Sequence, residues 1–147
     1  MEFDVVQDYY AQELMTPADR KAMLEQYKKK IYGQFYSRSG MPRDPSNVEL
    51  RNILAEFEQI SVVPADVAEL LLYRVEMAVE FANDFGGMPE GDYNTALTAF
   101  KKCLKMICEH KLEAYFKERC RTITAGKENY DYYFREGLND LYFEFLG

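Results

Sequence analysis

Residues 64–84 read PADVAELLLYRVEMAVEFAND, and this stretch decides the fold. It opens with a proline, which is favoured at the first position of a helix, and its apolar residues then recur at helical spacing. At about 100° per residue, the apolar side chains cover an arc of roughly 220°. A helix on the surface of a domain needs an apolar stripe only a little over about 100° wide. We therefore expect this helix to be packed on both flanks, at the centre of the core.

Helical periodicity continues on both sides of this central segment. Thr16-Pro17 is a start signal for a helix that ends near Tyr36, and Ser46 or Asn47 can cap the next one. Residues 37–45 contain glycine and prolines and are predicted to form a loop. Other helices are expected over about 3–14, from the cap Asp92 to the corner His110-Lys111, from there to Gly126, and over the tail around 134–145.

The sequence thus predicts an all-α protein with a single helical domain over residues 1–147. Five or six helices joined by short loops favour antiparallel neighbours. The arrangement is either an antiparallel bundle or a set of HEAT-like stacked helical hairpins.

Two features of the composition predict a cytoplasmic protein. The first fifteen residues contain no lysine or arginine, whereas a secretory signal peptide begins with basic residues. Cys103, Cys108 and Cys120 are odd in number and form no C-x-x-C pair, which is typical of buried thiols in a reducing compartment. No apolar run approaches the roughly 18 residues of a membrane span, so we expect no membrane contact.

Charge is distributed in blocks along the chain. Residues 20–43 and 101–127 are strongly basic, and residues 44–100 are strongly acidic. The blocks fit either a bipolar surface for a charged partner or oppositely charged helices packed side by side. Lys28, Lys29 and Lys30 lie among tyrosines, but the pI of 4.8 argues against nucleic-acid binding.

The sequence contains none of the usual enzymatic signatures. His110 is the only histidine, so neither two Glu-x-x-His motifs nor a well-supported nucleophilic triad can be assembled. The glycines after residue 85 lack the order of a phosphate-binding loop. We therefore predict no catalytic residue, no metal and no cofactor.

Arg74 is the most informative single residue, because it falls inside the apolar arc of the central helix. An arginine cannot shed its charge, so a buried one needs a carboxylate, a route to solvent or a bound anion. We expect it to be buried and to pair with Glu56, Glu49 or Asp131. The alternative is an anion-binding site between helices.

Two further sets of residues are candidate sites. Glu69, Tyr73 and Glu76 share the narrow polar side of the central helix, which is either a solvated face or, with Arg74, a binding site. Tyr132 and Phe143 point away from the apolar stripe of the last helix, about 20° apart on a helical wheel. A second layer of the domain or a partner must cover them, and a homodimer is the simplest partner.

The segment PADVAELLLYRVE, residues 64–76, resembles the central helix of a family of uncharacterised helical proteins common in Bacteroidetes-type genomes. The order of elements is also similar: a tyrosine-rich early helix, a helix containing Arg51, the central helix, and then Phe116–Arg119. The family usually has aspartate where Glu69 stands and a tryptophan near the tail, which this chain lacks. The resemblance implies helical architecture and bacterial origin, and it implies no activity.

We predict from these observations a small protein-interaction or regulatory module that binds through its helical faces. The alternative is an enzyme or small-ligand-binding protein that uses acidic residues near Arg74 and Tyr73. A pocket lined by Arg74, a tyrosine and two carboxylates would favour the alternative, and a large exposed aromatic patch would favour the module.

Overall fold

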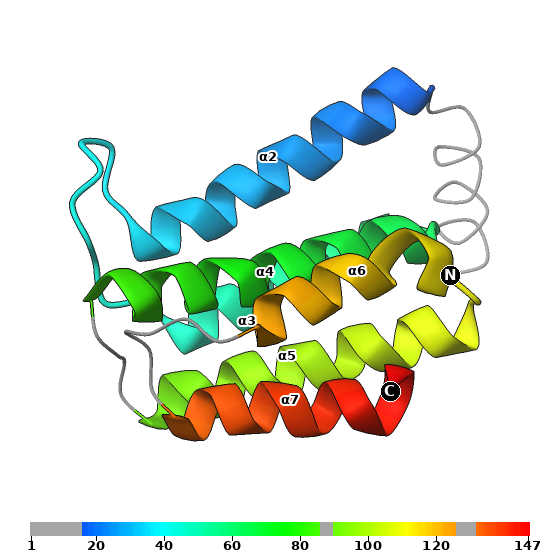
Figure 1. Ribbon diagram of the computed structural model, residues 1–147. Coiled ribbons are helices and arrows are strands. Elements are labelled where there is room, and N and C mark those ends of the chain that lie inside the picture. Colours follow the sequence, from blue (N-terminus) through cyan, green and yellow to red (C-terminus); the bar gives the residue numbers. More distant parts are fainter. Residues whose placement is uncertain (1–15, 86–89, 126–131) are drawn as a thin grey trace.

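A computed structural model describes residues 16–85, 90–125 and 132–147 of the chain, and these residues form six α-helices. The helices are α2 (Pro17–Phe35), α3 (Asn47–Ile60), α4 (Pro64–Phe85), α5 (Glu90–Glu109), α6 (Glu113–Thr124) and α7 (Tyr132–Leu146). They pack against one another in a bundle-like arrangement, and no strand occurs in the described ranges (Figure 1). The predicted all-α class is confirmed. The helix expected over about 3–14, like the stop at Gly126, lies outside the described residues.

Helix α4 is the centre of the bundle, as its wide apolar arc predicts. More than half of its residues are buried. In Figure 1, α2 lies above α4, α3 behind it, α6 in front, and α5 with α7 below. All four of α2, α3, α5 and α6 contact α4 directly, and α7 joins through α5 and α6.

The predicted helix boundaries follow local chemistry. Thr16 caps α2 by accepting a hydrogen bond from the Asp19 backbone N–H at 3.0 Å, and Ser46 caps α3 in the same way. The predicted corner at His110-Lys111 ends α5, where Lys111 adopts a left-handed φ of 56°. The Leu112 N–H then bonds back to the Ile107 carbonyl, which is a Schellman-type ending.

The start of α5 corrects one expectation. The helix begins at Glu90, so Asp92 lies in its first turn and is not the cap. Its carboxylate instead accepts a 2.7 Å hydrogen bond from the Asn47 amide at the start of α3. An acidic residue in the first turn is still favourable to the helix dipole.

The charge blocks become ion pairs between neighbouring helices. Basic residues of α2 pair with α4, through Arg20–Asp66 and Lys28–Glu69, and Lys102 of α5 pairs with Glu58 of α3. Arg119 of α6 reaches two carboxylates of α4. Of the two interpretations of the charge blocks, these ion pairs support the one in which oppositely charged helices pack side by side.

Candidate functional site

The structure buries Arg74 almost completely. Its exposed fraction is 1%, and it is the largest fully buried side chain among the described residues. Phe35 of α2 lies beneath the guanidinium, with its ring centroid 5.8 Å from the Cζ atom. The predicted burial of Arg74 is therefore confirmed.

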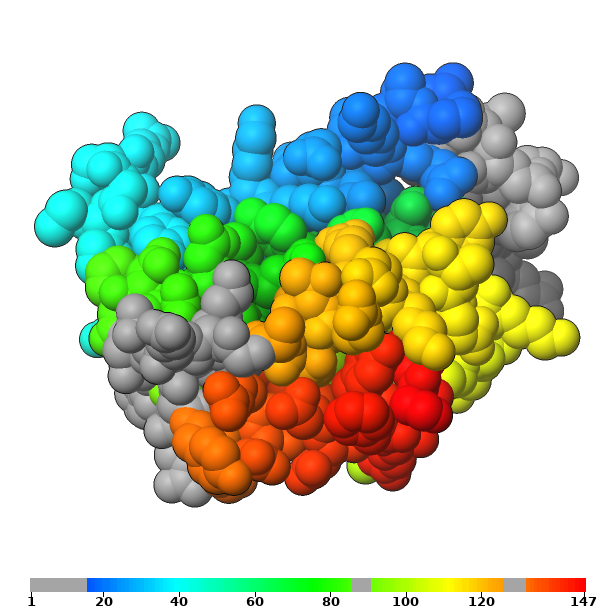
Figure 2. All heavy atoms as spheres, in the orientation of Figure 1, coloured from blue at the N-terminus to red at the C-terminus, as the bar shows by residue number. Residues whose placement is uncertain are grey.

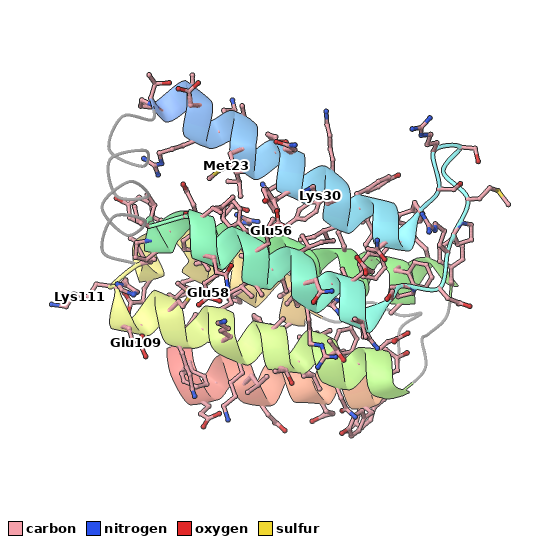
Figure 3. All side chains as sticks on the ribbon, turned by 180° about the vertical axis from the view of Figure 1, so that it is seen from behind. Met23, Lys30, Glu56, Glu58, Glu109 and Lys111 are labelled. Atoms are coloured by element: carbon pink, nitrogen blue, oxygen red, sulfur yellow. The ribbon has the colours of Figure 1, made fainter. Side chains whose placement is uncertain are left out.

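The predicted ion pair of Arg74 with Glu49 or Glu56 is wrong. The Glu56 carboxylate accepts a hydrogen bond from the Tyr27 hydroxyl of α2 at 2.7 Å, and it projects toward that helix in the view from behind (Figure 3). Glu49 is exposed at the start of α3. The third expected partner, Asp131, lies outside the described residues. The sequence pattern could not choose among these acids, because it does not give the rotation of each helix about its own axis. That rotation decides whether the polar side of a helix faces α4.

Two polar atoms of the Arg74 guanidinium lack a partner. Nε and Nη1 are buried and form no hydrogen bond within the described part of the chain. Burial lowers the pKa of Arg74 to about 10, although the charge of Asp92 acts in the opposite direction. At neutral pH the group thus remains a buried cation with unused donors.

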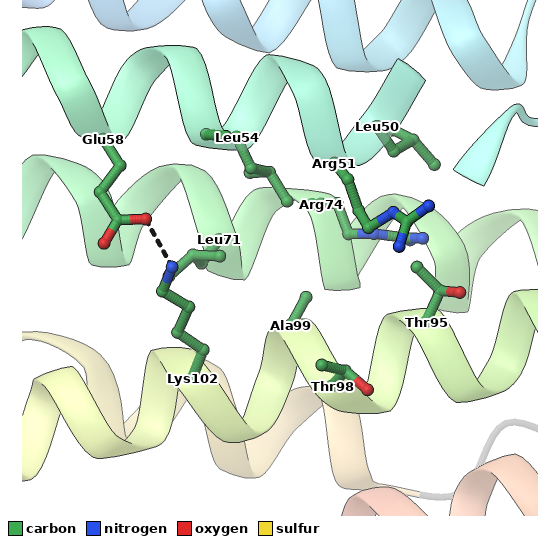
Figure 4. A pocket seen from close by; sticks show the side chains of 11 residues that line it. Leu50, Arg51, Leu54, Glu58, Leu71, Arg74, Thr95, Thr98, Ala99 and Lys102 are labelled. Carbon is green, nitrogen blue, oxygen red and sulfur yellow. Dashed lines mark hydrogen bonds and ion pairs between the residues drawn. The ribbon is translucent and has the colours of Figure 1, made fainter. Parts of the chain in front are cut away.

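A groove of about 270 Å³ opens beside this guanidinium, with α4 as its floor and α3 and α5 as its walls (Figure 4). The hydrogen bond from Asn47 to Asp92 and the Glu58–Lys102 ion pair both join α3 to α5, and they show that these two helices run in the same direction. The lining side chains are Leu50, Arg51, Leu54, Ala55, Glu58, Leu71, Arg74, Thr95, Thr98, Ala99 and Lys102.

The groove is polarised along its length. Arg51 and Arg74 lie at one end, and Leu54, Leu71 and Ala99 line the middle (Figure 4). At the other end the Lys102 ammonium and the Glu58 carboxylate are 2.5 Å apart and bridge the two walls. The site therefore offers a cationic end, an apolar middle and an internally neutralised far end.

Glu69, Tyr73 and Glu76 lie on a different flank of α4, and none of them lines this groove. The Arg119 guanidinium of α6 contacts Glu69 Oε1 at 2.5 Å and Glu76 Oε1 at 2.7 Å. Lys28 of α2 lies 3.3 Å from Glu69 Oε2, with its ammonium 5.3 Å from the Tyr73 ring centroid. Of the four candidate residues, only Arg74 lines the groove, and the other three lie on a different, polar flank of α4.

Cations of the protein itself occupy the polar flank, although Glu69 Oε2 accepts no hydrogen bond within the described residues and faces Lys28 only as an ion pair. Burial alone would raise the pKa of Glu69, but the hydrogen bond from Arg119 and the charges of Arg119 and Lys28 hold it below its ordinary value. A carboxylate held in this way joins helices and is poorly placed to receive a ligand cation. Within the residues that the structure describes, no group of three or more His, Cys, Asp or Glu side chains could hold a metal ion.

Sequence reasoning did not identify Arg51, Glu58, Thr95 and Lys102 as site residues. Their charges and spacing are ordinary for exposed helix faces. They become a site only because α3 and α5 run side by side across α4. Only Arg74 carried a signal in the sequence, as a cation within an apolar arc.

Tyr132 and Phe143 of α7 are each 68% exposed. Figure 2 shows α7 along the lower edge of the molecule. The two side chains point outward from the bundle, as the helical wheel predicts. Glu136 and Asn139 lie between them along the same side of the helix, so the two rings do not form one continuous apolar patch.

No protein-family model, curated protein or solved structure matches this chain. The resemblance to the Bacteroidetes-type family therefore remains a prediction. No helix of the described residues is long and apolar enough to cross a membrane.

Proposed function

We propose that this protein binds a small anionic ligand in the groove between α3 and α5, with Arg74 as the residue that holds the negative charge. One observation carries the proposal: a fully buried guanidinium has donors without partners and lines a cavity. An unpaired buried charge costs several kcal/mol. A ligand that supplies the missing acceptor would offset that cost when it binds.

Thermal unfolding in the presence of small anions tests this function. We expect at least one of phosphate, acetate, benzoate and octanoate to raise the Tm of the wild-type chain. At a hundredfold excess over Kd, a ligand stabilises by about 2.7 kcal/mol. For a chain of this size, that corresponds to a Tm rise of roughly 5–10 °C.

The matched variants are Arg74→Met and Arg121→Met. Arg121 lies on the surface of α6 and pairs only with Glu118 of its own helix among the described residues. The Tm rise should persist in Arg121→Met and disappear in Arg74→Met. The proposal would be contradicted if none of the anions changed the Tm of the wild type or of either variant.

A second candidate function is docking of a protein partner on α7, with a second copy of the chain as the simplest case. The exposure of Tyr132 and Phe143 favours it, because aromatic side chains contribute large contact areas at protein interfaces. The interrupted character of this surface makes it the weaker of the two candidates.

A further inference from the structure

The charges at the cationic end of the groove favour a single negative charge. Arg51 and Arg74 contribute two positive charges there, and Asp92 acts on Arg74 with one negative charge. Glu58 and Lys102 cancel each other at the far end. One anionic group therefore neutralises the site, whereas a dianion would leave an excess negative charge near Asp92.

Among the described residues that line this end of the groove, the available hydrogen-bond donors are the two guanidinium groups. The hydroxyl groups of Thr95 and Thr98 donate to the carbonyls of Gly91 and Asn94 in their own helix, each at 2.9 Å. They can accept a hydrogen bond from a ligand, but their own protons are committed. A carboxylate, with two oxygens, matches a guanidinium edge well. Guanidinium groups also bind phosphate, so the charge balance at this end, and not the number of donors, favours a carboxylate over a phosphate dianion.

The middle of the groove is apolar. Leu54, Leu71 and Ala99 line it, together with Ala55. From Arg51 to Glu58 the groove follows seven residues of α3, which is roughly 10 Å at the helical rise. Its volume of about 270 Å³ lies just below the roughly 300–1,000 Å³ typical of sites for drug-sized ligands. The space therefore fits a slender apolar chain better than a fused ring system.

We propose that the ligand is a monocarboxylate with a short to medium aliphatic chain, its carboxylate on Arg74 and Arg51 and its chain along Leu54 and Leu71 toward the Glu58–Lys102 bridge. This inference rests on the function proposed above and names the ligand class of that same groove. Both ends of the ligand contribute to binding, since its carboxylate satisfies the buried donors and its aliphatic chain removes apolar surface from water.

Titration calorimetry with four probes tests the ligand class on the full chain. The probes are octanoate, acetate, octanol and octyl phosphate. Octanoate should bind most tightly, and each of the other three should bind at least about tenfold more weakly, because each lacks the chain, lacks the charge or carries the wrong head group.

Two variants locate the binding site. Arg74→Met should weaken octanoate binding at least about tenfold, while Arg121→Met leaves it unchanged. Ala55→Leu places a larger side chain on the wall of the groove from an exposed position, so folding should be unaffected. This change should weaken octanoate binding more than acetate binding.

The outcomes separate the ligand class from the function. If octyl phosphate or acetate binds as tightly as octanoate and Arg74→Met weakens that binding, the proposed class is wrong and an Arg74-dependent anion-binding function stands. If octanol binds as tightly as octanoate, the charge does not contribute and both the class and the function are overturned. If no probe binds, or if Arg74→Met binds octanoate as the wild type does, both the class and the function are overturned.

Discussion

Arg74 combines two properties that are rarely found together, complete burial and unused hydrogen-bond donors. Burial lowers its pKa to about 10, which lies below the value of an arginine in an unfolded chain. A base with a lowered pKa in the folded state destabilises the fold at every pH where it stays charged, and this cost disappears only as pH rises through its titration range. The native protein therefore carries this cost at neutral pH.

Tyr27 provides a prediction at the same scale, because it is a buried polar group with a partner. Burial first, and then the hydrogen bond and charge of Glu56, raise the pKa of Tyr27 to about 12. The raised pKa means that its contribution to stability is complete below about pH 10, the value of free tyrosine, and is lost as pH rises toward 12.

We expect Tyr27→Phe to lower the unfolding free energy at pH 7 by about 1 kcal/mol. The difference from wild type should shrink between pH 10 and 12, measured by urea denaturation at each pH. Tyr115→Phe is the control, since Tyr115 is 75% exposed and should follow the wild type throughout. A constant difference between Tyr27→Phe and wild type across this range would show that the hydroxyl does not act through its neutral form.

At the scale of the elements, one arginine of α6 contacts two carboxylates of α4, in addition to the apolar packing of α6 in the core. Arg119 contacts Glu69 and Glu76, and the hydrogen bond to Glu69 is the main reason that its pKa lies above the ordinary value. Since the pKa of Glu69 is lowered, this stabilisation is present above the usual titration range of a carboxyl group and is lost as pH falls through the folded-state pKa.

Replacing Arg119 with methionine should lower the unfolding free energy at pH 7 by about 1–3 kcal/mol, because two neighbouring carboxylates lose their shared cation. Arg121→Met removes an exposed ion pair within α6 and should change the unfolding free energy by less than about 0.5 kcal/mol. Chemical denaturation of both variants measures the contrast. Equal, small effects would mean that the bridge between α6 and α4 is solvated and weak.

The helices could largely be predicted from the sequence, because their signals are local. The caps at Thr16 and Ser46 and the corner at Lys111 depend on residues within one turn of the boundary. The relative placement of α3 and α5 depends on contacts between residues about 45 positions apart, such as Asn47 with Asp92. No local pattern encodes such a contact, so the groove between these helices could not be predicted.

At the scale of the whole molecule, the outward side chains of α7 bear on whether the protein is a monomer or a dimer. Because Tyr132 and Phe143 are mostly exposed, Tyr132→Ser and Phe143→Ser should each change the unfolding free energy by less than about 0.5 kcal/mol. If they form an interface between two copies, the double variant should sediment as a monomer at concentrations where wild type is a dimer. A wild-type chain that stays monomeric at every concentration would rule out the homodimer.

The candidate site shows the same division between local and long-range information. The sequence singled out Arg74 because one cation interrupts an apolar arc, and it grouped Arg74 with the acids of the same helix. In the structure those acids, Glu69 and Glu76, bind Arg119 on another flank. The actual neighbours of Arg74 in the groove, among them Arg51 and Leu54, come from a different helix. A helical-wheel projection of α4 alone cannot show which neighbouring helix packs against each of its sides.

The most direct test of the account is the urea stability of Arg74→Met, with and without octanoate. A buried guanidinium with two unused donors costs more than a methionine of similar volume, so we predict that the variant is more stable than wild type by about 1–4 kcal/mol without ligand. Octanoate should then stabilise only the wild type. A variant that is less stable than wild type by several kcal/mol, with octanoate acting equally on both, would show that Arg74 supports the fold and does not hold a ligand.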